Sequence, residues 1–193
     1  MKSLAPIKDN NDLVTKQYCD NNFIKIDGGG TLIQNLTKNL IRNSWKINLD
    51  EWDWGASIWQ NIILDDGSVG ITRTGAWRGA SLKMMSDIEV GKTYTYSFYM
   101  HGVKGLRVDF YSSASEYAMY KVDKCNVSER YTMKSSKERI YFTFTVKDES
   151  HKQKLKSIRA ECATDGGTLT ISKPQLEEGE LTDYFPNINE FIK

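Results

Sequence analysis

Alternating apolar and polar residues predict a series of short β-strands along most of this chain. The clearest alternation runs from Gly91 to Gly102, where every second residue is large and aromatic or apolar and the residues between them carry hydroxyl groups. Because successive side chains of a strand point to opposite faces, this period of two predicts a strand with one buried face. Its inward residues are expected to be Tyr94, Tyr96, Phe98 and Met100.

Two more segments follow the same period. Between Leu106 and Tyr111, the inward residues are Val108 and Phe110, and the outward residues are Arg107, Asp109 and Tyr111. Between Ile140 and Val146, the inward residues are Ile140, Phe142, Phe144 and Val146. Shorter apolar pairs predict further strands within residues 58–71, 82–84 and 158–160. Many short strands, with no long amphipathic helix after residue 40, predict an all-β fold, an antiparallel two-sheet jelly-roll β-sandwich.

A strand is also predicted near the C-terminus. Leu169 and Ile171 point one way, and the hydroxylated residues around them point the other way. Pro174 has no N–H to donate to a neighbouring strand, so this strand is expected to run at a sheet edge or to break at the proline.

The first forty residues follow a different pattern. Asn11 or Asp12 can cap a short helix, in which Val14 and Tyr18 share a face. Such a short helix is marginal in water, so it needs a packing partner. Three glycines in a row are unfavourable inside a regular element, and we expect residues 28–30 to form a flexible joint. They do not form a phosphate loop, since no Gly-Lys-Ser/Thr follows.

Length and charge narrow the function classes. The chain has 193 residues, enough for one ordinary domain with an appendage. Its 26 basic and 25 acidic residues leave a net charge of +1 without a basic run, which argues against nucleic-acid binding. The opening residues lack the apolar stretch of a signal peptide, and no segment has the length of a membrane span. We therefore expect assembly in the cytosol without membrane insertion.

The three cysteines are far apart. Cys19, Cys125 and Cys162 contain no Cys-x-x-Cys spacing, which argues against a zinc knuckle and against a disulfide framework. We expect three packing thiols. A bond between Cys125 and Cys162 across a sheet stays open at this point.

Both ends of the predicted sandwich resemble one family. Pro174-Gln-Leu-Glu, followed by Gly179 and by Thr182-Asp-Tyr-Phe-Pro186, resembles the last strand of carbohydrate-binding-module-like jelly rolls, which are common on bacteriophage tail proteins and on glycoside hydrolases. Asn39-Leu-Ile-Arg-Asn-Ser-Trp45 resembles the opening Asn-Leu-Leu-x-Asn-Ser-x-Phe of the same modules. The resemblance implies a jelly roll over residues 39–187 and a C-terminal tail over residues 188–193.

The N-terminal segment resembles a second motif. Asp9 to Asp12, Thr15 to Tyr18 and Asp20 match Asp-Asn-Asp-x-x-x-Lys-x-Tyr-Val-Asp of phage tail-fibre and baseplate proteins, with Cys19 in place of the usual apolar residue. This resemblance implies a helical attachment and oligomerisation segment over residues 1–22, joined by a Gly-containing linker over residues 23–38. Because phage fibres with this motif are usually trimeric, we expect a homotrimer held partly by residues 1–35. The alternative is a capped helix packed on its own domain.

Catalysis is not expected. With only His101 and His151, no Ser/His/Asp or Cys/His set is suggested by spacing. The chain also lacks Gly-x-Ser-x-Gly, His-Glu-x-x-His and a Walker loop. We therefore expect no enzyme, no catalytic residue and no cofactor.

The strongest candidate chemistry is a cluster of tryptophans among charged residues in Asp50 to Trp59 and Thr74 to Arg78. Sugars combine apolar C–H faces with polar edges, so their sites need aromatic rings beside groups that bond hydroxyls. The glycan-binding candidates, including outward-facing tyrosines of the strands above, are Trp52, Asp53, Trp54, Trp77, Arg78, Tyr99, Tyr111 and Tyr141.

Some tryptophans are expected in the core instead. Trp45 and at least one of Trp54 and Trp59 should be packed there, and for Trp52 and Trp77 the core and the surface are equally open. A structural calcium ion is common in the modules that this chain resembles. Glu177 or Glu178, with carbonyls near Asn43, could bind it through oxygen, although a solvated turn is the other interpretation.

The leading hypothesis is a phage virion component of the tail or baseplate that binds host cell-surface glycan, as a receptor-binding or accessory adhesion protein. Its partners would be host carbohydrate and other tail or baseplate proteins. One alternative is a structural adaptor or trimerisation module that binds no sugar. Another is a free-standing carbohydrate-binding module of a glycan-degrading system. Solvent-exposed tryptophans would favour glycan binding over the adaptor.

Overall fold

The computed structural model describes residues 24–26, 30–32, 39–41, 44–49, 52–53, 59–77, 79–82 and 88–187. The chain forms two compact units, Met1–Thr37 and Lys38–Lys193. In the first unit, β1 (Ile24–Ile26) pairs antiparallel with β2 (Gly30–Leu32). Gly30 therefore lies in a strand, and the prediction that all three glycines form a joint is wrong at this residue. The predicted N-terminal helix and the C-terminal tail lie outside the described residues.

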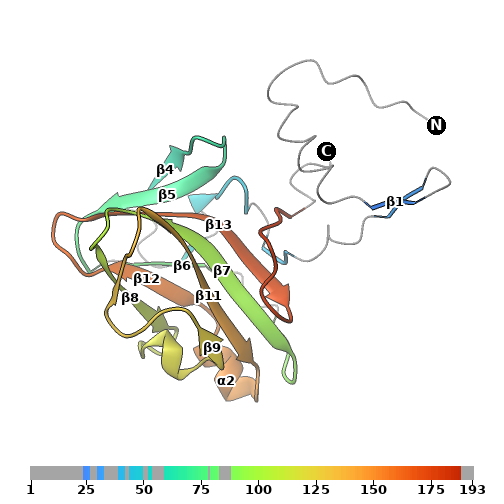
Figure 1. Cartoon of the computed structure of the whole chain (residues 1–193). Coiled ribbons are helices and arrows are strands. Elements are labelled where there is room, and N and C mark those ends of the chain that lie inside the picture. Colours follow the sequence, from blue (N-terminus) through green and yellow to red (C-terminus); the bar gives the residue numbers. More distant parts are fainter. Residues whose placement is uncertain are drawn as a thin grey trace. The chain divides into compact units, whose positions relative to one another are not determined.

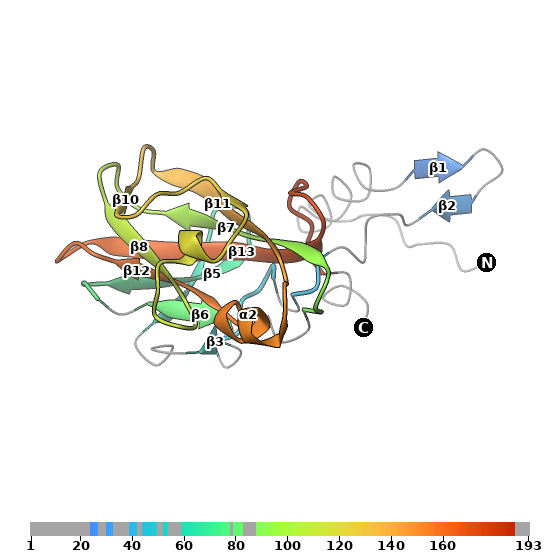
Figure 2. The ribbon, with the colours of Figure 1, turned by 90° about the horizontal axis from the view of Figure 1, so that it is seen from below.

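The second unit is a sandwich of two antiparallel sheets (Figures 1 and 2). The two antiparallel sheets confirm the predicted fold class, an all-β jelly-roll sandwich. The larger sheet has the strand order β4 (Gln60–Ile63), β5 (Val69–Thr74), β13 (Thr168–Glu178), β7 (Thr93–His101), β11 (Lys137–Thr145) and β9 (Lys124–Cys125). The smaller sheet has the order β10 (Tyr131–Thr132), β8 (Arg107–Ser112), β12 (Ile158–Cys162), β6 (Ala80–Leu82) and β3 (Trp52–Asp53).

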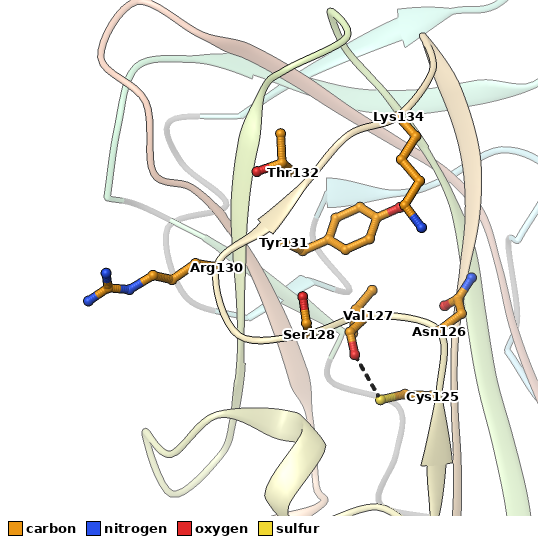
Figure 3. Close-up of a pocket in the computed structure, with 8 residues that line it drawn as sticks. All are labelled: Cys125, Asn126, Val127, Ser128, Arg130, Tyr131, Thr132 and Lys134. Atoms are coloured by element: carbon orange, nitrogen blue, oxygen red, sulfur yellow. Dashed lines mark hydrogen bonds between the residues drawn. The ribbon is translucent and has the colours of Figure 1, made fainter.

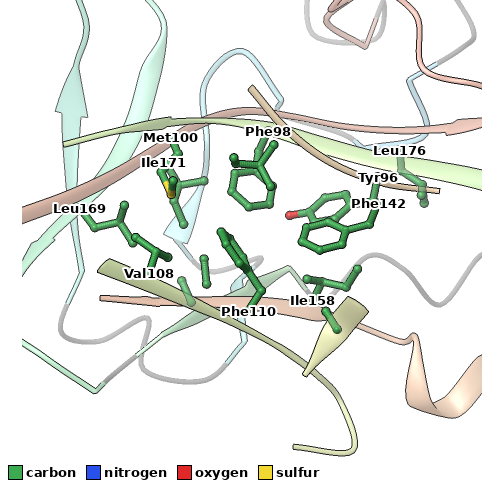
Figure 4. Close-up of a cluster of buried hydrophobic side chains, with 14 of the residues drawn as sticks. Tyr96, Phe98, Met100, Val108, Phe110, Phe142, Ile158, Leu169, Ile171 and Leu176 are labelled. Carbon is green, nitrogen blue, oxygen red and sulfur yellow. The ribbon is translucent and has the colours of Figure 1, made fainter. Parts of the chain in front are cut away.

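Aromatic residues fill the space between the sheets (Figure 4). The Phe110 ring of β8 lies with its centroid 5.6 Å from that of Phe142 and 6.3 Å from that of Phe98, so it joins the two layers. The period-two predictions for β7, β8 and β11 are confirmed, since every inward residue named from the pattern is at most 2% exposed. Trp59 is also in this core at 4% exposure, as expected.

β13 crosses the middle of the larger sheet, between β5 and β7. The prediction that Pro174 places this strand at an edge is wrong, whereas the predicted break at the proline occurs as an interruption of the ladder. The register with β7 shifts between Ser172 and Gln175, and Lys173 takes a left-handed φ of 50°. Such a bulge leaves Pro174 out of the ladder, so the strand continues past a residue that cannot donate.

The segment after β13 folds back over the outer face of the larger sheet. The buried Gln175 amide donates to Glu177 Oε1 at 2.8 Å and accepts from the Phe185 N–H at 2.8 Å. The buried Asn39 side chain donates to the carbonyls of Pro174 and Phe185 and accepts from the Leu176 N–H. These bonds hold both ends of the described unit against β13.

Two short helices complete the described part of the second unit. η4 (Ala118–Tyr120) follows β8, and α2 (Glu149–Lys154) is capped by Asp148, which accepts a bond from the His151 N–H. No helix in the described ranges has the length and apolar character needed to cross a membrane. Cys125 and Cys162 are both free thiols, so the bond between them does not form.

Candidate functional site

The outer face of the smaller sheet brings charged and aromatic side chains together. On β8 and β12 the core residues alternate with Arg107, Asp109, Tyr111, Arg159 and Glu161, which lie on the opposite face. Asp109 pairs with Glu161 across the strands, and Tyr111 pairs with Arg159. The register therefore places two carboxylates in one row and a ring beside a guanidinium in the next.

Each carboxylate of this face has its own arginine. Arg107 donates to Asp109 from Nε at 3.3 Å and from Nη2 at 3.0 Å. Arg159 Nε lies 2.6 Å from Glu161 Oε1. Burial raises the pKa of Glu161, the positive charge of Arg159 opposes this, and the negative charge of Asp109 adds to it. The face is thus rich in hydrogen-bonding groups without a large net charge.

Gly79, directly before β6, allows this arrangement. A Cβ at this position would lie 2.4 Å from Arg159 Cγ and 2.6 Å from Glu161 Cγ, closer than atoms can approach. The backbone N–H of Gly79 also bonds to Glu161 and favours its charged form. Any larger residue would displace the ion pair.

Three tyrosines lie at the end of β8 and directly after it. The rings of Tyr111 and Tyr117 stack with centroids 5.0 Å apart and planes inclined by 19°. Tyr120, which is 62% exposed, meets Tyr117 edge-on at 6.2 Å. The Arg159 guanidinium lies 5.1 Å from the Tyr111 ring centroid, and burial followed by the Tyr117 hydrogen bond raises the pKa of Tyr111 to about 12. Aromatic rings therefore lie beside donors and acceptors, the combination that sugars require.

Some tryptophan-cluster candidates are placed only by their backbone. Asp53 pairs with Ser81, which pairs with Arg159, so Asp53 occupies the same row as Tyr111. Trp52 occupies the next row, in which the described residues Ser112 and Ile158 are buried. Whether these two residues bind glycan stays a prediction. Trp54 and Arg78 lie outside the described residues.

Trp77 lies at the end of the smaller sheet, where its backbone N–H donates to the Cys162 carbonyl at 2.9 Å. Its side chain is 56% exposed, and its φ of 62° is left-handed. Few residues other than glycine adopt this conformation, and strained residues of this kind concentrate at functional sites. The open choice between core and surface is therefore settled for Trp77, which is a surface residue.

Tyr99 and Tyr141 lie on the opposite side of the sandwich from Tyr111. They belong to β7 and β11 of the larger sheet, whose core residues point toward the smaller one. The expectation that all three tyrosines line one surface is wrong, because alternation tells inward from outward residues but does not assign strands to sheets. Cations already surround the Tyr99 ring, with Lys137 Nζ at 5.0 Å and the Arg139 guanidinium at 5.7 Å from its centroid.

Trp45 differs from its predicted core position. It is partly exposed on the outer side of the larger sheet, where its ring stacks on Tyr184 at 6.5 Å. Lys173 Nζ lies 4.7 Å from the Trp45 ring centroid. The bulge in β13 directs this lysine toward the tryptophan, which explains why Trp45 packs outside the core.

Glu177 and Glu178 do not share a metal site. Glu177 is buried and accepts bonds from Gln175 and from the N–H and hydroxyl of Thr182. Glu178 is exposed and pairs with Lys92 at 3.2 Å. Neighbouring residues of a strand face opposite ways, so their carboxylates diverge. No group of three His, Cys, Asp or Glu side chains suited to a metal occurs among the described residues.

Sequence reasoning missed Glu161 and the Tyr117–Tyr120 pair. Residues 158–160 were expected to form a strand, but the alternation was not extended to Glu161. Tyr117 follows a polar turn, and only the bridge between Tyr111 and Tyr117 brings it onto the face. The available sequence signal for this pair is the spacing of three residues between Tyr117 and Tyr120.

No protein-family model and no curated protein matches the chain. Solved structures share its fold at low identity. The N-terminal CBM22-1–CBM22-2 tandem of Paenibacillus barcinonensis Xyn10C is 12% identical with a TM-score of 0.50, and the match covers 77% of this chain and 49% of that one. TmCBM61 in complex with β-1,4-galactotriose is 12% identical with a TM-score of 0.45, covering 74% of this chain and 100% of that one.

The enzymatically active domain of bacteriophage CBA120 tailspike protein 4 is 10% identical with a TM-score of 0.43, and the match covers 73% of this chain and 21% of that one. This chain thus spans about half of the tandem structure and about a fifth of the tailspike structure. At these identities the similarity concerns the fold alone.

Proposed function

We propose that this protein binds glycan on the outer face of the smaller sheet. One observation carries the proposal: the stacked Tyr111–Tyr117 pair lies beside Arg159, which pairs with Glu161 in the adjacent row. A pyranose can stack on the partly exposed tyrosines while its hydroxyl groups bond to the charged groups. The tandem that shares this fold at a TM-score of 0.50 consists of carbohydrate-binding modules, which supports the choice of ligand.

The role is binding rather than catalysis. A general acid or base must exchange a proton with its substrate. Here both Asp109 and Glu161 are buried and already form ion pairs with arginines. These ion pairs favour a fixed recognition surface over proton transfer.

The proposed setting is a bacteriophage tail or baseplate, in which residues 1–22 attach the protein and residues 1–35 help to form a trimer. The sequence resemblances at residues 9–20, 39–45 and 174–186 support this setting. A free-standing carbohydrate-binding module would have the same sheet face. Detection of the protein in purified virions would separate the two, because the free-standing module would be absent from them.

Attachment would depend on valency. An open site that stacks one or two rings contributes about 1 to 3 kcal/mol for each ring, by analogy with base stacking. Joining several weak sites raises the apparent affinity by roughly 100- to 10,000-fold without a new contact. A trimer would therefore adhere to a glycan surface even when each site binds weakly.

A glycan array tests the proposal, with Tyr117→Ala as the variant and Tyr141→Ala as its control. Both changes remove one partly exposed tyrosine, but from opposite faces of the sandwich. Tyr117→Ala should weaken binding by roughly 5- to 150-fold, which corresponds to about 1 to 3 kcal/mol. Equal losses in both variants would contradict the assignment of binding to this face, and no binding to any glycan by the wild type would favour the non-binding structural adaptor.

A further inference from the structure

A pocket of about 490 Å³ lies where the chain passes from one sheet to the other (Figure 3). β9 is the edge strand of the larger sheet, and β10 is the edge strand of the smaller one. The pocket is an open one beside the connection between them, and its lining residues are Cys125, Asn126, Val127, Ser128, Arg130, Tyr131, Thr132 and Lys134. The volume falls in the range of small-molecule sites and exceeds that needed for a bare ion.

The lining is cationic. Arg130 and Lys134 line the pocket, and none of the described lining residues is acidic. Neither cation forms an ion pair with a described residue, in contrast to the two arginines of the sheet face. The carboxylate of Glu138 is already occupied, since it accepts the Tyr131 hydroxyl at 3.0 Å and the Lys134 N–H at 3.1 Å. Hydrogen bonds from these neutral donors leave the negative charge of Glu138 in place, so the lining has two positive charges and Glu138, next to it, has one negative charge.

The two cations are placed differently. The Lys134 side chain lies along the Tyr131 ring, with Nζ 6.0 Å from its centroid, whereas Arg130 extends away from the ring at the rim (Figure 3). Arg130 also has a left-handed φ of 53°. Its exposed side chain can change rotamer on the picosecond to nanosecond scale, so it can turn toward a bound group.

The pocket lies next to the proposed glycan face. Thr132, which lines the pocket, pairs with Arg107 of that face. Neighbouring strands lie about 4.8 Å apart, roughly the length of one sugar ring, so one oligosaccharide can reach both. The pocket also offers the Ser128 and Thr132 hydroxyls, which suit sugar hydroxyl groups.

We propose that this pocket is a subsite for the carboxylate of an acidic sugar, and that the glycan on the neighbouring face contains uronic acid residues. This inference rests on the proposed function for the sugar and on the pocket itself for the charge. Lys134 would bind the carboxylate as a point charge, and Arg130 would close over it with paired N–H donors.

Titration of the isotopically labelled full chain, followed by the NMR shifts of its backbone amides, tests the subsite. Glucuronate should shift the Ser128 and Thr132 amides in a saturable way, whereas glucose should not. Lys134→Gln should weaken this response on the order of tenfold, the effect of losing one charge-assisted hydrogen bond. Lys156→Gln removes the same charge from an exposed position outside the pocket and should leave the response unchanged.

Three results would overturn the subsite: no shift with glucuronate, an equal shift with acetate, or equal losses in Lys134→Gln and Lys156→Gln. An equal shift with acetate would mean a general anion site without sugar recognition. The array separates this inference from the proposed function. If Tyr117→Ala weakens binding on the array while glucuronate does not shift the Ser128 and Thr132 amides, only the subsite proposal is wrong. If glucuronate shifts the Ser128 and Thr132 amides while Tyr117→Ala binds glycan like the wild type, the proposal that the smaller-sheet face binds glycan is wrong.

Discussion

Asp109 on β8 and Glu161 on β12 are paired residues, so two nearly buried carboxylates lie side by side on the outer face of the smaller sheet. Like charges directly opposite each other are unfavourable, and burial adds a desolvation cost. Arg107 and Arg159 offset both effects, since each forms an ion pair with one carboxylate. The row is therefore held by balanced charges, and the loss of one charge should be measurable.

The first prediction concerns Glu161→Gln. Because burial raises the folded-state pKa of Glu161, the folded protein holds this proton more tightly than the unfolded chain. The contribution of Glu161 to stability should therefore be fully present below the ordinary glutamate pKa of 4.5 and should be lost as the pH rises through the raised pKa. Glu161→Gln lacks this dependence. Its free energy of unfolding should therefore increase relative to that of the wild type as the pH rises.

Urea unfolding at a series of pH values measures this difference. Glu129→Gln, which changes an exposed carboxylate, is the control and should differ from the wild type by less than about 0.5 kcal/mol at each pH. A constant difference between Glu161→Gln and the wild type across the series would contradict the prediction.

Asp66 should behave in the opposite way. Burial alone would raise its pKa, but hydrogen bonds from Lys173 and Ser68 lower the pKa to about 2. Its contribution to stability should be present above the ordinary value of 3.8 and should be lost as the pH falls toward 2. Asp66→Asn should thus be less stable than the wild type at neutral pH and equal to it in strong acid.

Lys173→Gln gives an independent check on this pair. Removal of the ammonium group should raise the pKa of Asp66 toward 3.8, as measured by the carboxyl carbon shift in NMR. An unchanged Asp66 pKa in this variant would show that the ion pair does not form in solution.

Asn39→Asp should release the C-terminal segment. The change keeps the shape but replaces the amide that donates to the carbonyls of Pro174 and Phe185 with a carboxylate. One buried and one partly buried carbonyl would then lack this donor and face a negative charge, a loss of roughly 2 kcal/mol or more. Hydrogen exchange should become faster at the Phe185 and Asn187 amides. Wild-type protection at both amides would exclude the predicted role of Asn39.

Trp77 allows a matched pair of variants. Its side chain is 56% exposed, so Trp77→Ala should leave the core intact and weaken attachment of the multivalent protein to host cell wall. Trp77→Gly removes the same ring and also relieves the left-handed φ of 62°, so it should be about 1 kcal/mol more stable than Trp77→Ala. Thermal melting and a cell-wall binding assay measure the two effects. If Trp77→Ala binds as the wild type does, this tryptophan is outside the site.

The sequence was sufficient for the inward residues of β7, β8 and β11, because the side-chain period of a strand is local information. It did not separate Tyr99 from Tyr111, since the assignment of strands to sheets depends on long-range pairing. For the same reason, the sequence did not predict the pairing of Asp109 with Glu161.

Local rules also failed where one part of the chain covers another. Thr95 and Ser97 are outward residues of β7, yet both are fully buried. Gly179 accepts a bond from the Thr95 hydroxyl, and the Arg139 guanidinium joins Ser97 to the Thr182 carbonyl. Only the folded chain shows that the segment after β13 returns over this face.

The bond between the Asn187 side chain and the Asn39 carbonyl, at 2.8 Å, brings the two ends of the sandwich to one point. A domain whose ends meet can be spliced into a surface loop of another protein with little strain on the host, because its entry and exit need only a small gap. The sandwich is therefore suited to insertion into a loop of another protein. Engineers could graft it into a reporter enzyme, where occupancy of the sheet face would be read as a change in the reporter signal.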